Sequence, residues 1–410
     1  MQIISKKGVK IFRDFYIDME IKPYAVPDTV KIPIGVKNDG IVLNKVAGDK
    51  VGKCEIVAYS KGDYPVYSPV NGIFTDVIQG PAVNGFMDMQ YAVIKTDGTD
   101  LPTSPLWETK ADYSKTELID IIKRAGIFNE WAKGYFFDFI NKKTNYRKLI
   151  IDCVDDQPYD LSRTAVLLNY QNEVIKGAEI LCNAFGIPKT ELLVMKNFCT
   201  ESLLKKGIDN IDIVKVGGKY PVSPEIVQYA HKNTALRVGV QCCRAVYRAA
   251  YFGEPQISSI VTVWGEGVQS PANLEVLNGT PTKFLLERCK AKGIIERVIG
   301  GGVMSGYVVS TEYPLMRGDG CLTAMPLKKH NQTLDCVNCG RCAEVCPMDL
   351  APYFILRSSK KIGDKMVKQI CAGMCIFCGA CSYICPSRQP LTEKIREYND
   401  MVISGVIYDE

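Results

Sequence analysis

The 410-residue sequence lacks the features of several broad classes of protein. It has no run of about 18 consecutive apolar residues, and residues 1–15 alternate charged and apolar side chains, so we predict neither a transmembrane segment nor a secretory signal. The 50 basic and 45 acidic residues leave a formal charge of only +5, which disfavours a nucleic-acid-binding surface. A composition of 47% hydrophobic and 23% charged residues disfavours disorder, collagen and coiled coil. We therefore expect a packed, soluble, cytoplasmic protein.

Histidine is also scarce, and His231 and His330 are the only two in the sequence. Neither has a third partner nearby, so both are predicted to be surface residues and not parts of a proton relay or metal site. A phosphate-binding loop is missing as well, because the glycine run 300–302 is followed by Val-Met where such a loop has Lys-Ser/Thr. The pattern predicts a hairpin turn there.

The length predicts two to four domains at about 100 to 200 residues per domain. Residues 28–98 contain short β-rich runs broken by turn residues, which indicates a compact β domain. Residues 113–252 alternate helical and strand-like segments, which predicts an α/β layer with a mostly parallel sheet. One long amphipathic helix is expected over 165–186, and a small α+β module is expected to follow residue 254.

What the sequence has in abundance is cysteine, with 17 residues. Two groups follow the spacing C-x2-C-x2-C-x3-C-P, which is that of bacterial two-cluster ferredoxins. The first group is Cys336, Cys339, Cys342 and Cys346 followed by Pro347, and the second is Cys375, Cys378, Cys381 and Cys385 followed by Pro386. The remaining cysteines are scattered, which suggests a reducing cell interior; they are Cys54, Cys153, Cys182, Cys199, Cys242, Cys243, Cys289, Cys321 and Cys371.

The spacing predicts which thiolates share a cluster. Three thiolates from one short loop cover three irons of a [4Fe-4S] cube, and in such repeats the fourth binds the other cluster. We assign one cluster to Cys336, Cys339, Cys342 and Cys385, and the second to Cys375, Cys378, Cys381 and Cys346. Gly340 and Gly379 hold equivalent positions, where a missing Cβ allows close approach of the backbone. Structural zinc is the alternative, but it does not require two runs of four cysteines.

Two nearby features remain open from the sequence. Cys371 competes formally with Cys375 as a ligand, but only Cys375 matches the repeat. The segment between the two groups is basic, and its cations either raise the cluster potentials or form a solvated helix face. These residues are Arg357, Lys360, Lys361, Lys365 and Lys368, against the single acid Asp364.

The segments VCPMDLAP and CIFCGACSYICPSRQPLTEKIREYN resemble the C subunit of the Rnf electron-transport complex, a family that includes cobalamin-reductase-like and proline-reductase-associated relatives. Looser similarity extends along nearly the whole chain. The resemblance implies a multidomain α/β and α+β protein. It would comprise a barrel-sandwich (lipoyl-like) domain at 1–100, a Rossmann-like α/β domain similar to the NADH-binding subunit of complex I at 112–253, an SLBB β-grasp module at 254–310 and an α-helical two-cluster ferredoxin-like domain at 328–400.

Three segments depart from the flavin-binding pattern of that family. The segment after AGI keeps only Gly134 of a glycine-rich loop, DDQPY carries Gln157 in place of a carboxylate, and VQCCRAVYRA lacks the usual Asn-containing turn. Bulky side chains add to the first departure, namely Trp131, Tyr135, Phe136 and Phe137. FMN and NADH binding are therefore disfavoured, although Tyr159 remains available to stack on a ring.

Two polar or reactive pairs in these segments also have ordinary interpretations. Cys242 and Cys243 are adjacent, and we predict small buried residues in preference to a redox dithiol. Asp155 and Asp156 precede turn-forming residues, and we predict capping in preference to cation binding.

The leading hypothesis is an electron-transfer protein without catalytic residues that relays single electrons through two [4Fe-4S] clusters. Its redox partner would be a flavoprotein, a ferredoxin, or a reductase or Rnf-like complex. The protein would be cytoplasmic, and a membrane complex as partner would place it peripherally at the inner face of the cell membrane. The first alternative is an FMN-containing NADH-oxidising subunit. The second is a scaffold in which the clusters are only structural.

Overall fold

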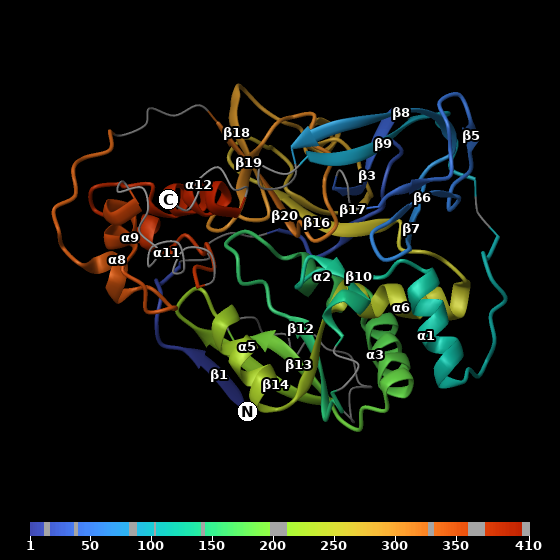
Figure 1. Ribbon diagram of the computed structural model, residues 1–410, viewed down its shortest axis with the longest axis horizontal. Helices are drawn as coiled ribbons and strands as arrows, with labels where there is room; N and C mark the ends of the chain where they lie inside the picture. The colour runs from blue at the N-terminus through green and yellow to red at the C-terminus, as the bar shows by residue number, and fades with distance from the viewer. Residues whose placement is uncertain are drawn as a thin grey trace.

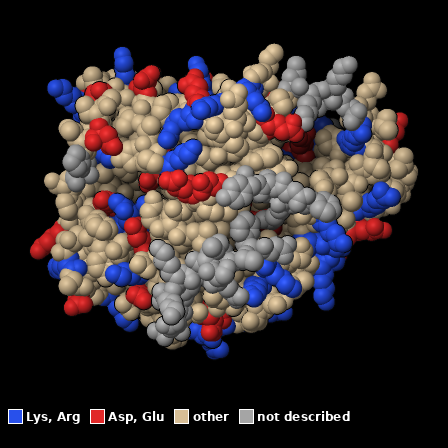
Figure 2. Space-filling view, turned by 180° about the vertical axis from the view of Figure 1, so that it is seen from behind, with Lys and Arg blue, Asp and Glu red and all other residues tan. Residues whose placement is uncertain are grey.

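The computed structural model describes residues 1–11, 17–36, 40–81, 88–101, 104–140, 144–196, 211–326, 332–359 and 374–403. It has an α/β layer, two β-rich parts and a helical C-terminal module (Figure 1). Within these ranges no helix is long and apolar enough to cross a membrane. On the face shown in Figure 2, acidic and basic side chains are interspersed.

The α/β layer is built on a five-stranded parallel sheet, which confirms the mostly parallel sheet predicted. In spatial order its strands are β1 (Gln2–Ser5), β14 (Ile211–Gly218), β13 (Thr190–Met195), β12 (Lys148–Cys153) and β15 (Ala235–Gly239). Because side chains alternate along a strand, Ile150 packs with α5 (Ser223–Lys232) on one face. Leu149 and Ile151 pack on the other face with α1 (Lys115–Arg124), α2 (Ser162–Asn169), α3 (Gln171–Phe185) and α6 (Val240–Phe252).

The N-terminal strand lies elsewhere than the sequence led us to expect. β1 pairs in parallel with β14, from Gln2 opposite Lys215 to Ser5 opposite Gly218. Residues 2–5 therefore join the α/β layer and not the β domain predicted for residues 1–100. Ile3 is buried with the α5 side of the core, whereas Ile4 is exposed, so one face of this short strand contributes to packing.

The helix expected over 165–186 consists of two helices, α2 and α3, that are broken at Tyr170. The Asn169 side chain donates hydrogen bonds to the carbonyls of Ala165 and Met19, and the Arg244 guanidinium lies 3.9 Å from the Tyr170 ring centre. The backbone of Tyr170 leaves the helical region at this point, with φ −126° and ψ 32°. The second helix ends at Gly186 as predicted, in the left-handed conformation with φ 67°.

A six-stranded mixed sheet follows the α/β layer in the chain. In spatial order it comprises β19 (Tyr307–Val309), β18 (Ile295–Gly300), β20 (Cys321–Pro326), β16 (Ser258–Trp264), β17 (Ala272–Leu277) and β2 (Ile21–Lys22), with α7 (Thr282–Arg288) packed on it. The antiparallel pair β18 and β19 forms the hairpin predicted at the glycine run 300–302. The sheet extends past residue 310, where the resemblance placed the end of this module, because β20 pairs with both β16 and β18.

The N-terminal β-rich part contains two sheets that enclose a common core. One consists of β3 (Thr29–Val36), β9 (Asp88–Thr96), β8 (Gly72–Pro81) and β5 (Lys50–Val51), and the other of β4 (Val42–Leu43), β6 (Ile56–Ser60) and β7 (Tyr64–Tyr67). A small hairpin of β10 (Phe128–Asn129) and β11 (Gly134–Tyr135), followed by a 3-10 turn at Phe136–Phe139, precedes β12.

The C-terminal module contains α8 (Arg341–Glu344), α9 (Pro352–Ser359), α11 (Ala380–Ile384) and α12 (Leu391–Ile403). It lies against the end of the β18–β19 hairpin (Figure 1). Arg396 of α12 donates hydrogen bonds to the carbonyls of Ser305 and Gly306 at 2.9 and 3.0 Å. A Cβ on Gly379 would lie only 2.1 Å from the Met304 carbonyl oxygen, so the module and the hairpin loop are in close contact.

Candidate functional site

The structure places the eight cysteines of the repeat around two separate cavities. Cys336, Cys339, Cys342 and Cys385 line a cavity of about 180 Å³. Its surroundings are open to solvent, since Cys339 is exposed and the nearby Leu334, Val337 and Phe354 side chains are 59%, 66% and 52% exposed. Cys385 comes from the second motif, so this cavity joins the same four cysteines that the sequence assigned to one cluster.

The second cavity is smaller and lies deeper. Cys346, Cys375, Cys378 and Cys381 line it, and its volume is about 20 Å³. Burial, together with the neighbouring thiols of Cys381, Cys375 and Cys346, raises the pKa of Cys378 to about 12. Cys346 of the first motif therefore lies among the thiols of the second.

The two loops share the same backbone conformation, as expected for copies of one motif. Asn338 and Phe377, two residues after the first cysteine of each motif, have positive φ angles of 54° and 50°. Gly340 and Gly379 are left-handed at 75° and 81°. A Cβ at Gly340 would meet nothing within 4 Å, so the backbone conformation is what favours glycine at that position.

Backbone N–H groups point at the thiols in both loops. The N–H groups of Asn338 and Leu350 each donate to a cysteine sulfur, of Cys336 and Cys346 respectively, at 3.4 Å. Gln389 N–H donates to Cys385 Sγ at 3.5 Å, the counterpart of the Leu350 contact in the other motif. Such donors stabilise thiolates and influence the potential of a cluster bound by them.

The arrangement suits a polynuclear cluster better than a single ion. Among the residues that the structure describes, no three His, Cys, Asp or Glu side chains form a group that could hold a metal ion. The thiols instead line two cavities, four to each, which matches the number of cysteine ligands that a [4Fe-4S] cluster takes. Tetrahedral zinc would require four sulfurs converging on one point.

The second cavity is linked to the body of the protein by residues far away in sequence. Tyr220 donates from its hydroxyl to the Cys378 carbonyl at 2.8 Å, and Gln157 donates from Nε2 to the Tyr220 hydroxyl at 2.8 Å. Arg396 lies over the Phe377 ring, 5.5 Å from its centre. The sequence pointed to Gln157 only as a lost carboxylate and did not indicate Tyr220 or Arg396.

Some of the candidates lie outside the described residues, namely Cys199, His330, Cys371, Lys360, Lys361, Asp364, Lys365 and Lys368. Arg357 is described and exposed. His231 is exposed as predicted, and Cys242 and Cys243 are fully buried, as predicted for core residues. Burial raises the pKa of both thiols.

The carboxyl edge of the parallel sheet, where folds of this kind bind ligands, is occupied by the chain's own side chains. The order of strands along the sheet reverses between β12 and β15, and α6 begins there. The Glu130 carboxylate accepts hydrogen bonds from the N–H groups of Gln241 and Cys242 at 2.7 and 3.0 Å. A Cβ on Gly239 would lie 2.0 Å from the Glu130 carboxyl carbon. A buried carboxylate thus fills the position at which a helix N-terminus would hold an anion.

Two further helices that begin at this edge, among the residues that the structure describes, are capped in the same way. Asp155 accepts hydrogen bonds from the N–H groups of Arg163 and Thr164 at the start of α2. Asp156 accepts them from Val222 and Ser223 at the start of α5. Both aspartates therefore cap helices, as the sequence predicted.

The aromatic residues in the segments that depart from the flavin-binding pattern also contact other side chains of the chain. Trp131 lies over the Arg237 guanidinium at 4.2 Å, and Tyr135 stacks on Tyr64 with ring centres 4.2 Å apart. Tyr159 stacks on Trp264 at 3.7 Å with an interplanar angle of 3°. One face of the Tyr159 ring is therefore already covered. Glu130 occupies the N-terminus of α6 more directly than these rings do, and the sequence did not single it out.

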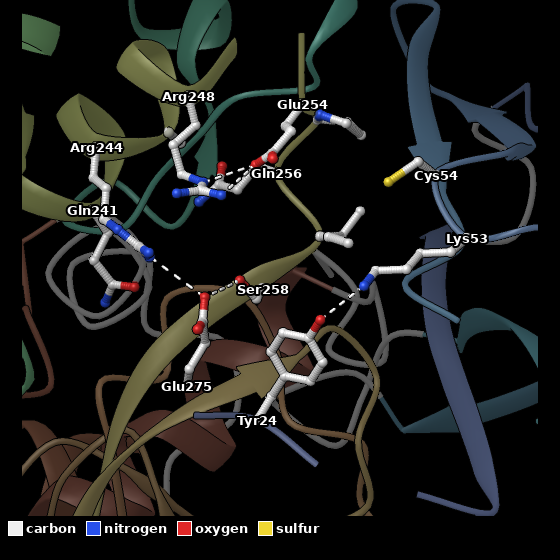
Figure 3. Close-up of a pocket in the computed structure, with 13 residues that line it drawn as sticks. Tyr24, Lys53, Cys54, Gln241, Arg244, Arg248, Glu254, Gln256, Ser258 and Glu275 are labelled. Atoms are coloured by element: carbon white, nitrogen blue, oxygen red, sulfur yellow. Dashed lines mark hydrogen bonds and ion pairs between the residues drawn. The ribbon is translucent and has the colours of Figure 1, made fainter. Parts of the chain in front are cut away.

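A further cavity of about 230 Å³ lies away from the cysteines of the two motifs, between the N-terminal β-rich part, α6 and β16, and Cys54 is one of its lining residues (Figure 3). Its cations are paired: Lys53 contacts Asp100, Arg248 contacts Glu254 and Arg244 contacts Glu275. Each cation of the wall therefore has an acidic partner.

Comparison with known proteins adds a family context to this geometry. A family model described as a 4Fe-4S dicluster domain matches residues 335–388. The chain is 26% identical over 371 residues to the C subunit of the proton-translocating ferredoxin:NAD(+) oxidoreductase complex of Clostridium ljungdahlii, covering 82% of this chain and 79% of that protein. It is 26% identical to the C subunit of the ion-translocating oxidoreductase complex of Buchnera aphidicola, covering 72% of this chain and 63% of that protein.

The matched share varies among these relatives. The chain spans 70% of the corresponding C subunit of Rhodobacter capsulatus at 25% identity and 46% of the Vibrio cholerae one. Among solved structures, an NAD+-reducing [NiFe]-hydrogenase in the air-oxidized state is similar with a TM-score of 0.49 and 11% identity, over 70% of this chain and 61% of that one. The sequence comparisons confirm the resemblance: the chain is a relative of the C subunits of Rnf-type ion-translocating oxidoreductase complexes and carries a 4Fe-4S dicluster domain.

Proposed function

We propose that the chain relays single electrons through two [4Fe-4S] clusters, each bound by three cysteines of one motif and the fourth cysteine of the other. The observation that carries this proposal is the exchange of Cys346 and Cys385 between the two cavities. Such clusters supply reversible one-electron chemistry when bound. The protein's own contribution is to bind them, direct N–H groups at their ligands and limit their access to water.

The two ends of the relay differ in exposure. The first cavity is surrounded by exposed apolar side chains, Leu334, Val337 and Phe354, and a redox partner would dock there. The second is packed against the β18–β19 hairpin and the α/β layer. The pKa of Cys381 is raised mainly by burial, and the nearby Cys342 of the first cavity also contributes to the shift. The two cavities are therefore neighbours. Electrons would pass from the exposed site to the deeper one or in reverse.

The iron content and the ligand exchange can be tested together. We expect about eight irons and eight acid-labile sulfides per chain after anaerobic reconstitution. Cys385→Ser should damage the cluster held mainly by the first motif, and Cys346→Ser the cluster held by the second, as read by EPR. Cys371→Ser is the matched control and should keep both signals. Four or fewer irons, or loss of only the cluster of the mutated motif, would contradict the assignment.

We further propose that residues 112–253 hold neither FMN nor NADH. The support is that Glu130, Asp155 and Asp156 occupy the N-termini of α6, α2 and α5, where phosphates of such cofactors bind in comparable folds. Anaerobic purification, flavin extraction and an NADH-to-viologen assay test this. Stoichiometric FMN with rapid viologen reduction would establish the NADH-oxidising alternative instead.

The partner and the finer domain division belong to the same proposal. We propose an Rnf-like complex or a reductase as the partner, with the chain bound to it peripherally, on the strength of its relatives. The two-sheet part would be a barrel-sandwich domain and the mixed sheet an SLBB β-grasp module. Reversible reduction by dithionite without unfolding would separate this relay from a scaffold with structural clusters.

A further inference from the structure

We propose that Gln157 and Tyr220 are positioning residues that tune the second cluster through the main-chain carbonyl of Cys378. This inference rests on the proposed two-cluster function and identifies the residues of the body that act on one cluster alone. It assigns a role to Gln157, which sequence comparison marked only as the loss of a carboxylate.

The hydrogen bonds form one continuous chain with a defined direction. The main-chain N–H groups of Met304 and Ser305 donate to Gln157 Oε1 at 3.3 Å each. A main-chain N–H can only donate, so the amide oxygen must face this loop and the amide nitrogen must face Tyr220. Nε2 then donates to the Tyr220 hydroxyl at 2.8 Å, which donates in turn to the Cys378 carbonyl at 2.8 Å.

An amide is the side chain that this position requires. Gln157 accepts on one side and donates on the other, whereas a glutamate would only accept. With a glutamate in its place, the Tyr220 hydroxyl would donate to the carboxylate, because charge-assisted hydrogen bonds are stronger than neutral ones, and would turn away from Cys378. The fit around the side chain is close, since a Cβ on Gly302 would lie 2.6 Å from Gln157 Cγ.

The chain of donors has a predictable electrostatic effect. The Tyr220 hydroxyl directs the positive end of its dipole at the loop that carries Cys378, which favours the reduced, more negative form of the cluster. Removing that dipole lowers the reduction potential, and adding a carboxylate lowers it further. The first cluster, bound by Cys336, Cys339, Cys342 and Cys385, has no part in these contacts.

The test is an EPR-monitored redox titration of anaerobically reconstituted full-length protein. For Gln157→Glu we expect a tenfold shift of the second cluster's reduction equilibrium toward the oxidised form, which is about 59 mV for one electron. Tyr220→Phe and Gln157→Met should shift it in the same direction by less, because they remove hydrogen bonds without adding charge. Gln79→Glu, an exposed residue on β8, is the matched control for the added charge and should shift neither cluster.

The outcomes separate this inference from a structural role and from the proposed function. If Tyr220→Phe and Gln157→Met lower thermal stability but leave the second potential at the wild-type value, the contacts only hold the module in place and the inference is wrong. An equal shift of both clusters would also overturn it. If Gln157→Glu does not fold, these two variants decide. Wild-type protein without two cluster signals would refute the proposed function instead.

Discussion

Truncation of Glu130 to alanine is the sharpest test of how the carboxyl edge of the parallel sheet is closed. The side chain is 5% exposed, and its carboxylate is the acceptor for the N–H groups of Gln241 and Cys242. Glu130→Ala removes both acceptor oxygens and leaves a space the size of the four lost heavy atoms at the start of α6. Neither N–H has water in easy reach, since Gln241 and Cys242 are 8% and 0% exposed.

The magnitude follows from two opposing effects. Each buried donor that loses its acceptor costs about 1–3 kcal/mol, so two cost about 2–6 kcal/mol. Removing the carboxyl group also has a favourable effect on stability, because the charged form of Glu130 is costly to bury. Burial raises the pKa of Glu130, and the Arg163 guanidinium lowers it in part. We therefore expect a net loss of about 2–4 kcal/mol. Glu130→Gln keeps one acceptor and should lose about half as much.

The assay combines thermal unfolding with hydrogen exchange at the start of α6. Peptides containing Gln241 and Cys242 should lose protection in Glu130→Ala, whereas exposed Glu179→Ala on α3 should behave like the wild type. Acetate has the four heavy atoms that the mutation removes, so it should rescue the variant and leave the wild type unchanged. At an acetate concentration 100 times its Kd, mass action returns about 2.7 kcal/mol.

Two results would refute this reasoning. Unchanged stability and unchanged exchange in Glu130→Ala would mean that the carboxylate does not hold the helix end. Equal stabilisation of wild type and variant by acetate would mean that the wild-type edge still offers an anion site, and the argument against a nucleotide would then fail with it.

Three further predictions concern single residues. Burial, with Asp160 as the second cause, raises the pKa of Asp155 from 3.8 to about 7. The folded state therefore binds a proton that the unfolded state releases. This contribution to the free energy of unfolding is present below about pH 4 and is lost as the pH rises through 7. Urea unfolding should show a difference in slope of up to about 1.4 kcal/mol per pH unit between wild type and Asp155→Asn in this window, and parallel curves would contradict the assignment. Gly340→Ala should lower the free energy of unfolding by about 1–2 kcal/mol, because the backbone at this position is left-handed. Gly379→Ala should lower it distinctly more, because the added Cβ would also meet the Met304 carbonyl. Equal losses of the two variants in thermal unfolding would show that the C-terminal module does not dock against Met304. Arg396→Gln should lower the reduction potential of the second cluster by ~59 mV, a tenfold change in the reduction equilibrium, because it removes a cation beside Cys375. Lys394→Gln on the same helix is the control and should leave the potential unchanged. Equal potentials of the two variants in an EPR titration would rule this out.

Local signals in the sequence were enough to predict the elements that depend on neighbouring residues. The cysteine spacing grouped the thiols as the two cavities do, because each loop closes within a few residues and Gly340 and Gly379 permit its left-handed turn. The helix ending at Gly186 and the capping of α2 by Asp155 are equally local, whereas Asp156 caps α5, 66 residues further along the chain. Periodicity likewise indicated three strands of the parallel sheet, β12, β13 and β14, since their burial alternates or is continuous along a short segment.

Tertiary structure decided the features that join distant segments. The pairing of β1 with β14, the seat of Glu130 at α6 and the contact of Tyr220 with Cys378 each connect residues that lie far apart in the chain. None of these leaves a local pattern, because a hydrogen bond to a distant N–H or carbonyl places no constraint on the residues beside it in sequence. The break at Tyr170 was not predicted either: the helical pattern is continuous there, and at the break Asn169 contacts the distant Met19 carbonyl while Arg244 lies over the Tyr170 ring. The local cysteine spacing therefore determines which ligands the chain offers to a cluster. The packing of distant segments determines that the first cavity is exposed and that the second lies against the α/β layer.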